Sequence, residues 1–147
     1  MTIFLMILHV VLHNIDEHVF NKRRSHSRAE IWSMISDAIL FIIPLLMATF
    51  ITYRPDLEIV YKTVAGASMI SIVKNELFYK NLEVKERLVH ACLYVLHPIL
   101  LFNFYESWQN NYFQEHPEFW MVQLFYVGMG FKSISYQLIY WNYIHNK

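Results

Sequence analysis

Long apolar stretches recur along this chain of 147 residues. The clearest covers residues 38–52, which include Pro44 but no charged side chain. With its flanks, this stretch reaches the length of about 20 residues that a helix needs to cross a membrane. Apolar residues make up 56% of the sequence, and a globule this small could not bury so much apolar surface. The sequence therefore predicts an integral membrane protein.

Five segments are predicted to form membrane-spanning helices, at residues 2–20, 33–53, 58–79, 88–107 and 119–144. The first is not interpreted as a secretory signal, because it lacks a positive leading region and a small-residue cleavage site. No linker or repeat divides the chain, so we expect one domain over residues 1–147, an all-α, polytopic helical bundle. Small residues at 65–68, Gly128 and Gly130 favour close contacts between helices.

The basic residues predict the orientation of the five spans. Most of them fall in connections or ends on one side of the predicted membrane: Lys22, Arg23, Arg24, Arg28, Lys80, Lys85, Arg87 and Lys147. Arg54 lies on the other side, and the remaining basic residues fall within spans. Because cytoplasmic segments are enriched in Lys and Arg, we expect the N-terminus outside and the C-terminus in the cytoplasm.

Charge and cysteine content limit the classes of partner. Lys and Arg together number 12, as do Asp and Glu, so the formal net charge is zero. The charge balance therefore gives no indication of a nucleic-acid partner. The single cysteine, Cys92, cannot form an internal disulfide. Partners are expected among membrane lipids, a lipidic substrate, a redox partner and further subunits of an oligomer or larger membrane complex.

Ionisable side chains inside the predicted spans form two stripes. Glu86, His90 and His97 are spaced by four and seven residues, which places them on one face of a helix at about 100° per residue. Charged groups cost roughly 2.5–3.5 kcal/mol at the membrane centre, so their presence in a span indicates a functional role. A second stripe, in the predicted helix 2–20, comprises His9, His13, Asp16 and Glu17.

The two stripes lie at matching depths, because one helix runs inward and the other outward. This places Glu17 level with Glu86. One turn deeper, His13 is level with His90. Carboxylates and imidazoles without thiolates favour di-iron or di-manganese centres over structural zinc, with zinc kept as an alternative. The predicted metal ligands are His13, Glu17, Glu76, Glu86 and His90, with His9, Asp16 and His97 supporting them or completing a second metal position.

Two further charged residues and four histidines have separate interpretations. Lys132 falls near the middle of the last predicted span and is expected to pair with Asp37 or another buried acid. Asp37 begins the second predicted helix on the cytoplasmic side, where the helix dipole favours a carboxylate. The remaining histidines are interpreted as loop or interface residues: His18, His26, His116 and His145.

The segment from His13 to Glu17, with Asp16 before the glutamate, carries a family resemblance. It resembles the His-x-x-Glu-Glu signature of the HXXEE group of small bacterial multi-pass membrane proteins, with Asp in place of the first Glu. The resemblance covers this one motif. It implies that His13, Asp16 and Glu17 act together and that the chain lies in a bacterial inner membrane, but it implies no reaction.

The leading functional hypothesis is a membrane metalloprotein, with iron, manganese or zinc bound near the cytoplasmic leaflet. Such a metal could activate oxygen or water, as in an oxidoreductase or hydrolase that acts on a lipidic substrate. The first alternative is a proton- or ion-conducting or transporting subunit that uses the same residues. A second alternative is a b-haem protein with axial pairs His13/His90 or His9/His97, and a third is an accessory membrane subunit.

Overall fold

The computed structural model describes residues 2–23, 25–78 and 82–144. Of the predicted basic residues, Arg24, Lys80 and Lys147 lie outside the described part, as does His145. Within the described part the chain is 91% helical and has no strand, so the predicted all-α helical bundle is confirmed.

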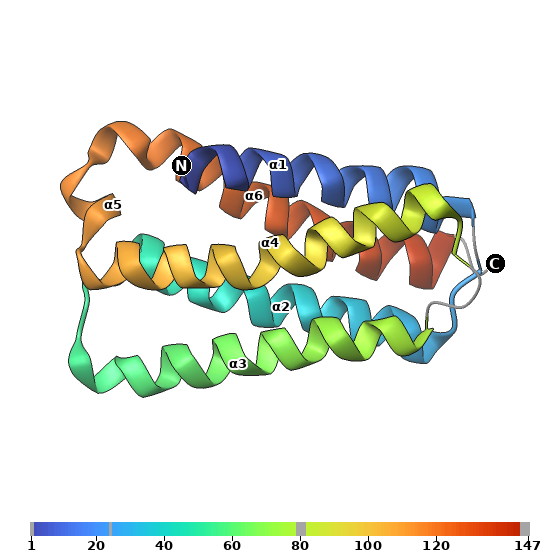
Figure 1. Cartoon of the computed structure of the whole chain (residues 1–147), viewed down its shortest axis with the longest axis horizontal. Coiled ribbons are helices and arrows are strands. Elements are labelled where there is room, and N and C mark those ends of the chain that lie inside the picture. Colours follow the sequence, from blue (N-terminus) through green and yellow to red (C-terminus); the bar gives the residue numbers. More distant parts are fainter. Residues whose placement is uncertain (1, 24, 79–81, 145–147) are drawn as a thin grey trace.

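Five long helices run side by side and reverse direction at each connection (Figure 1). In chain order they are α1 (Thr2–Ile15), α2 (Arg28–Phe50), α3 (Glu58–Asn75), α4 (Val84–Gln109) and α6 (Trp120–Tyr136). Helix α2 is central and packs against α3, α4 and α6, whereas α1 packs against α4 and α6.

Shorter helical segments extend or join the long helices. A π-helical turn, η1 (Asp16–Phe20), and a 3₁₀ turn, η2 (Asn21–Arg23), continue α1. The others are η3 (Pro55–Leu57) before α3, η4 (Glu76–Phe78) after it, α5 (Tyr112–Glu115) and η5 (Pro117–Phe119) before α6, and η6 (Gln137–Ile144) after it. We refer to the two ends of the bundle as the η1 end and the α5 end.

Among the described residues, three helical segments are long and apolar enough to cross a membrane. They are Thr2–Arg23, Arg28–Phe50 and Val84–Gln109, and they overlap the predicted spans at residues 2–20, 33–53 and 88–107. The other two predicted spans correspond to α3 and α6. Their crossing of the membrane and the orientation of the chain stay predictions.

Aromatic side chains fill the bundle towards the α5 end. Phe104 and Trp108 of α4 are fully buried, and Tyr61 of α3 stacks on Trp108 with 5.4 Å between the ring centroids. The polar atoms of these rings have partners, since Trp108 Nε1 donates to the Ile51 carbonyl and the Tyr61 hydroxyl donates to the Leu101 carbonyl, each at 2.8 Å. This half of the bundle is therefore closed by packing.

One predicted small-residue contact is present at Gly130, where α6 approaches α2. A Cβ atom added there would lie 2.9 Å from Ile42 Cδ1, so a larger residue would displace that side chain. Gly66 and Gly128 have open space at the same position, and for them the predicted close contact is wrong. Ser68, next to Gly66 in the small-residue stretch, is instead buried and bonded to His97.

We expect Phe104→Ala to lower the free energy of unfolding by roughly 2 kcal/mol or more, because the fully buried ring would leave a cavity. Phe102→Ala is the matched control, since Phe102 lies on the same helix with 61% of its surface exposed. Denaturant titration in detergent micelles measures both values. Equal losses for the two variants would contradict the packing described for α4.

Candidate functional site

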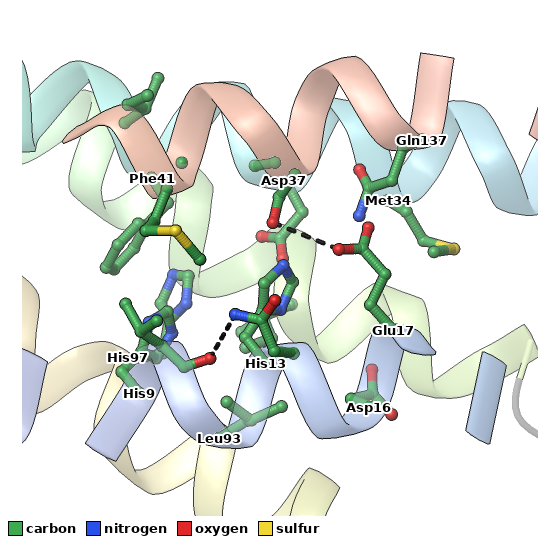
Figure 2. A pocket seen from close by; sticks show the side chains of 18 of the residues that line it. His9, His13, Asp16, Glu17, Met34, Asp37, Phe41, Leu93, His97 and Gln137 are labelled. Carbon is green, nitrogen blue, oxygen red and sulfur yellow. Dashed lines mark hydrogen bonds between the residues drawn. The ribbon is translucent and has the colours of Figure 1, made fainter. Parts of the chain in front are cut away.

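A cavity of about 130 Å³ lies inside the bundle, between α1 with η1, α2, α4 and α6 (Figure 2). It is nearer the η1 end than the aromatic core. Its lining includes seven titratable side chains, all of them singled out from the sequence: His9, His13, Asp16, Glu17, Asp37, His90 and His97.

The position of α1 between two helices explains how adjacent acids both become buried. Consecutive residues of a helix point about 100° apart, so Asp16 and Glu17 cannot share one face. Asp16 turns towards α4 and Glu17 towards α6, and their side chains enter different contacts. Both residues belong to the π-helical turn η1, a type of turn that is frequent at functional sites.

The Glu17 carboxylate is only partly satisfied, although just 1% of the residue is exposed. Its Oε2 accepts a long hydrogen bond of 3.4 Å from the Ser133 hydroxyl and lies 3.6 Å from Lys132 Nζ. Its Oε1 has no hydrogen-bond partner among the described residues. Lys132 also donates to Asn14 Oδ1 at 2.8 Å and lies 2.7 Å from His18 Nε2, so its charge is shared among several groups.

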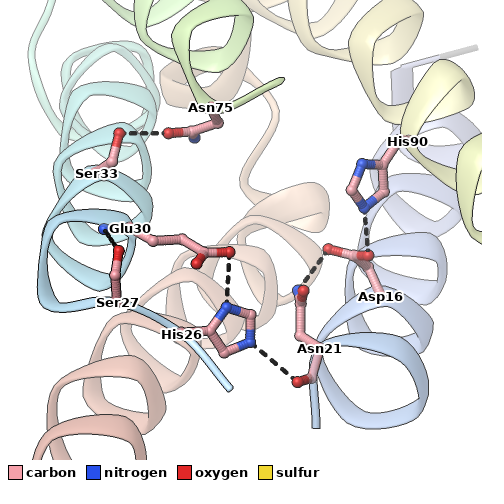
Figure 3. Close-up of polar contacts among 8 residues, drawn as sticks. All are labelled: Asp16, Asn21, His26, Ser27, Glu30, Ser33, Asn75 and His90. Carbon is pink, nitrogen blue, oxygen red and sulfur yellow. Dashed lines mark hydrogen bonds and ion pairs between the residues drawn. The ribbon is translucent and has the colours of Figure 1, made fainter. Parts of the chain in front are cut away.

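Both carboxylate oxygens of Asp16 have hydrogen-bond partners. The imidazole of His90 donates from Nε2 to Asp16 Oδ1 at 2.8 Å, and the Asn21 amide donates to the other oxygen at 2.9 Å (Figure 3). Asn21 in turn accepts at its carbonyl from His26 Nε2, at 3.0 Å. This chain of bonds ties η1 and η2 to α4 and fixes the carboxylate in place.

His26 extends the same chain to α2. Its Nδ1 lies 2.7 Å from Glu30 Oε1 while its Nε2 donates to a carbonyl, so a proton must lie between Nδ1 and the Glu30 carboxyl group. The interpretation of His26 as a loop or interface residue misses this burial between Glu30 and the Trp141 ring. The spacing of four residues between His26 and Glu30, together with the Ser27 hydroxyl that caps α2, is a signal that could have revealed it.

Three histidines line the deeper part of the cavity. His9 and His13 stack one helical turn apart with parallel rings, and the Phe41 ring lies against His9 on one side and His97 on the other. His9 Nδ1 is 2.9 Å from the Tyr126 hydroxyl, and His97 Nε2 is 2.8 Å from the Ser68 hydroxyl.

Asp37 of α2 reaches the cavity from the side opposite α1 (Figure 2). Its Oδ1 is buried and has no hydrogen-bond partner among the described residues. Lys132 contacts Glu17, so of the two alternatives expected for this lysine the structure favours another buried acid over Asp37.

The structure does not bring the five predicted metal ligands together. Glu76 is exposed and accepts from the Tyr94 hydroxyl at 2.5 Å, and Glu86 is buried but does not line the cavity. His13, Glu17 and His90 do line it, although Asp16 occupies one nitrogen of His90. Within residues 2–23, 25–78 and 82–144, no group of three or more His, Cys, Asp or Glu side chains is arranged to hold a metal ion.

The haem pairs His13/His90 and His9/His97 stay a prediction, because a histidine ligand commonly uses its other ring nitrogen in a hydrogen bond. His90 and His97 each use Nε2 in a hydrogen bond, and His9 uses Nδ1.

Comparisons of the chain with protein-family models, curated proteins and solved structures found no match. The site is therefore interpreted from its own geometry.

We expect the Asp16–His90 pair to be strongly coupled, because removing either partner leaves a buried polar group behind. Asp16→Ala and His90→Ala should each lower the free energy of unfolding by about 3 kcal/mol or more. In a double-mutant cycle, the free energy of unfolding of the double variant should fall by clearly less than the sum of the two single decreases.

The exposed pair formed by His116 and Glu118, with 3.1 Å between Nδ1 and Oε1, is the matched control. Its coupling should stay below about 1 kcal/mol, since exposed ion pairs are screened by solvent. Additive losses at Asp16 and His90 would contradict the buried pairing.

Proposed function

We propose that all five long helices cross the membrane, with the N-terminus outside and the C-terminus in the cytoplasm. Large apolar side chains project outward from α3 and α6 as they do from the other helices. Ile70 on α3 is 72% exposed and Met121 on α6 is 78% exposed. Lipid chains are the environment that suits such surfaces, because water-soluble proteins seldom expose contiguous apolar area of this extent.

The orientation follows from the connections. The η2 turn that follows α1 and the start of α4 lie at the same end in Figure 1. Both carry described basic residues, which are Lys22 and Arg23 in η2 and Lys85 and Arg87 in α4. The opposite end carries α5 and the acids Glu115 and Glu118. The positive-inside rule assigns the η1 end to the cytoplasm.

Labelling of single cysteines tests this topology in a Cys92→Ser background. We expect Glu115→Cys to react with a membrane-impermeant maleimide in intact spheroplasts, because α5 would face outward. Lys85→Cys should react only after permeabilisation. Both positions are exposed in the structure, so accessibility alone does not separate them. Labelling of both from one side would contradict five spans, and the reversed pattern would invert the orientation.

We infer that the chain is a proton- or cation-transporting membrane subunit with Glu17 as its central binding group. The observation that carries this proposal is the Glu17 carboxylate, buried at 1% exposure with one oxygen unpartnered among the described residues. It lines a cavity that is also lined by histidines and by two further carboxylates, Asp16 and Asp37. Intramembrane carboxylates and imidazoles that face a cavity are the groups that proton relays and ion pathways use.

The spacing of the titratable groups along α1 supports the same proposal. His9, His13 and Glu17 are each four residues apart and all line the cavity. At a rise of 1.5 Å per residue they cover roughly 12 Å, a substantial part of a hydrocarbon core about 30 Å thick. The motif residues His13, Asp16 and Glu17 of the HXXEE resemblance all take part in this lining.

A metalloprotein acting on a lipidic substrate has weaker support. The ligand set that the hypothesis requires is dispersed, since Glu76 bonds with Tyr94 and Glu86 lies away from the cavity. The transport proposal requires groups that can bind and release a cation, and the cavity contains such carboxylates and imidazoles.

We expect Glu17→Gln to lower proton flux about tenfold or more, because an amide cannot take up and release a proton. Purified protein in liposomes, with a trapped pH-sensitive dye and a potassium diffusion potential, measures this flux. Glu17→Asp should keep part of the flux. Glu115→Gln removes an exposed carboxylate and should leave it unchanged.

Flux no faster than in empty liposomes, or an unchanged Glu17→Gln variant, would overturn the transport proposal. Elemental mass spectrometry on the same preparations tests the competing hypothesis. One or two equivalents of iron, manganese or zinc that disappear in His13→Ala would favour a metalloprotein instead.

A further inference from the structure

The cavity has an excess of hydrogen-bond acceptors. Glu17 Oε1 and Asp37 Oδ1 are both buried and have no donor among the described residues. Gln137 Oε1 is a third acceptor of this kind, and its residue lines the same cavity. Figure 2 shows the three side chains converging from η1, α2 and η6. Burying unsatisfied acceptors is costly, so the arrangement points to a ligand that donates hydrogen bonds.

The protein's own cations do not fill this role. Lys132 Nζ lies beside Glu17 Oε2, the opposite oxygen of the carboxylate, and donates to Asn14. Lys74 of α3 acts on Asp37 only through space, and it is exposed. Two of the three unmet acceptors belong to carboxylates, which favour a donor that also carries positive charge.

The rest of the cavity is apolar and partly aromatic. Phe41, Leu93, Tyr126 and Met129 contribute to its wall. The volume of about 130 Å³ approaches that of cavities of roughly 150 Å³ that hold a benzene ring. Tyr126 adds an aromatic ring to the wall, and aromatic faces attract a cation placed within about 6 Å. The space thus suits a small organic body attached to a charged donor group.

We propose that this cavity binds a small organic molecule with a primary ammonium group. Its N–H donors meet Glu17 Oε1 and Asp37 Oδ1, and its apolar part lies among Phe41, Leu93 and Met129. The proposal rests on the proposed function, in that it treats Glu17 as a cation-binding group, and it names the class of cation. An ammonium group supplies three donors, whereas a quaternary ammonium supplies none.

Benzylammonium is the probe, because it combines a ring of suitable size with three N–H donors. Thermal unfolding of the full chain in detergent, followed by tryptophan fluorescence, reports binding as a rise in Tm with concentration. Benzyl alcohol controls for partition into micelles, and benzyltrimethylammonium keeps the charge without the donors. Ammonium chloride tests whether the charged group alone suffices. We expect benzylammonium to raise Tm clearly more than all three.

Two variants assign the effect to the cavity. Glu17→Gln and Asp37→Asn should each weaken the apparent affinity about tenfold or more, the loss expected for a charge-assisted hydrogen bond. Glu115→Gln should bind as the wild type does. Size-exclusion profiles establish that each variant is folded, and Asp37→Asn keeps the test valid if Glu17→Gln does not fold.

The proposal is overturned if benzyl alcohol or benzyltrimethylammonium raises Tm as much as benzylammonium, or if both variants bind it unchanged. Equal stabilisation by ammonium chloride would reduce the site to an inorganic cation site and also contradict it. Failure of binding with intact proton flux would remove this inference alone. Binding of benzylammonium without proton flux would instead remove the proposed transport function.

Discussion

The burial of two consecutive carboxylates, Asp16 and Glu17, governs how the bundle is assembled. They are 7% and 1% exposed, and a helix can hide adjacent side chains only when it has neighbours on two sides. Helix α1 meets this condition between α4 and α6. The π-helical turn η1 contains both acids, and they contact different helices, Asp16 through His90 of α4 and Glu17 through Ser133 of α6. The cavity forms where α1, so placed, faces α2.

Polar and aromatic groups occupy different halves of the bundle. The cavity with its histidines and acids lies towards the η1 end, and Phe104 and Trp108 close the packing towards the α5 end. A transported cation would reach the cavity from the cytoplasm and could leave on the other side only if this packing opened. Pro44 and Pro98 lie inside the helices that border both halves. Each removes one helical hydrogen bond, so α2 and α4 bend most easily at these points.

The helical class and the histidines and acids that line the cavity follow from the sequence, because hydropathy and four-residue spacing are local properties. The spacing of His9, His13 and Glu17 alone places them on one face, and all three line the cavity. The rotation of α4 about its axis is not a local property. Whether Glu86 reaches the cavity depends on how α4 packs against several helices, and in the structure Glu86 does not line the cavity.

The contacts that the sequence did not predict are made by hydroxyl groups. Three hydroxyl groups form hydrogen bonds with predicted site residues: Tyr94 with Glu76, Tyr126 with His9, and Ser68 with His97. Hydroxyl residues are common on apolar faces and give no periodic signal of their own. The pairing of Lys132 with Glu17 rather than Asp37 is likewise set by which helices are neighbours.

The unmet acceptors also bear on stability. A buried acceptor left without a donor costs about 1–3 kcal/mol, and more when it is charged. Glu17 and Asp37 each carry one such oxygen among the described residues, whereas Asp16 nearby has donors for both of its oxygens. The fold can therefore satisfy a carboxylate fully in this region. A bundle optimised for stability alone would hold apolar residues at the other two positions, so the proposed cation would account for their presence.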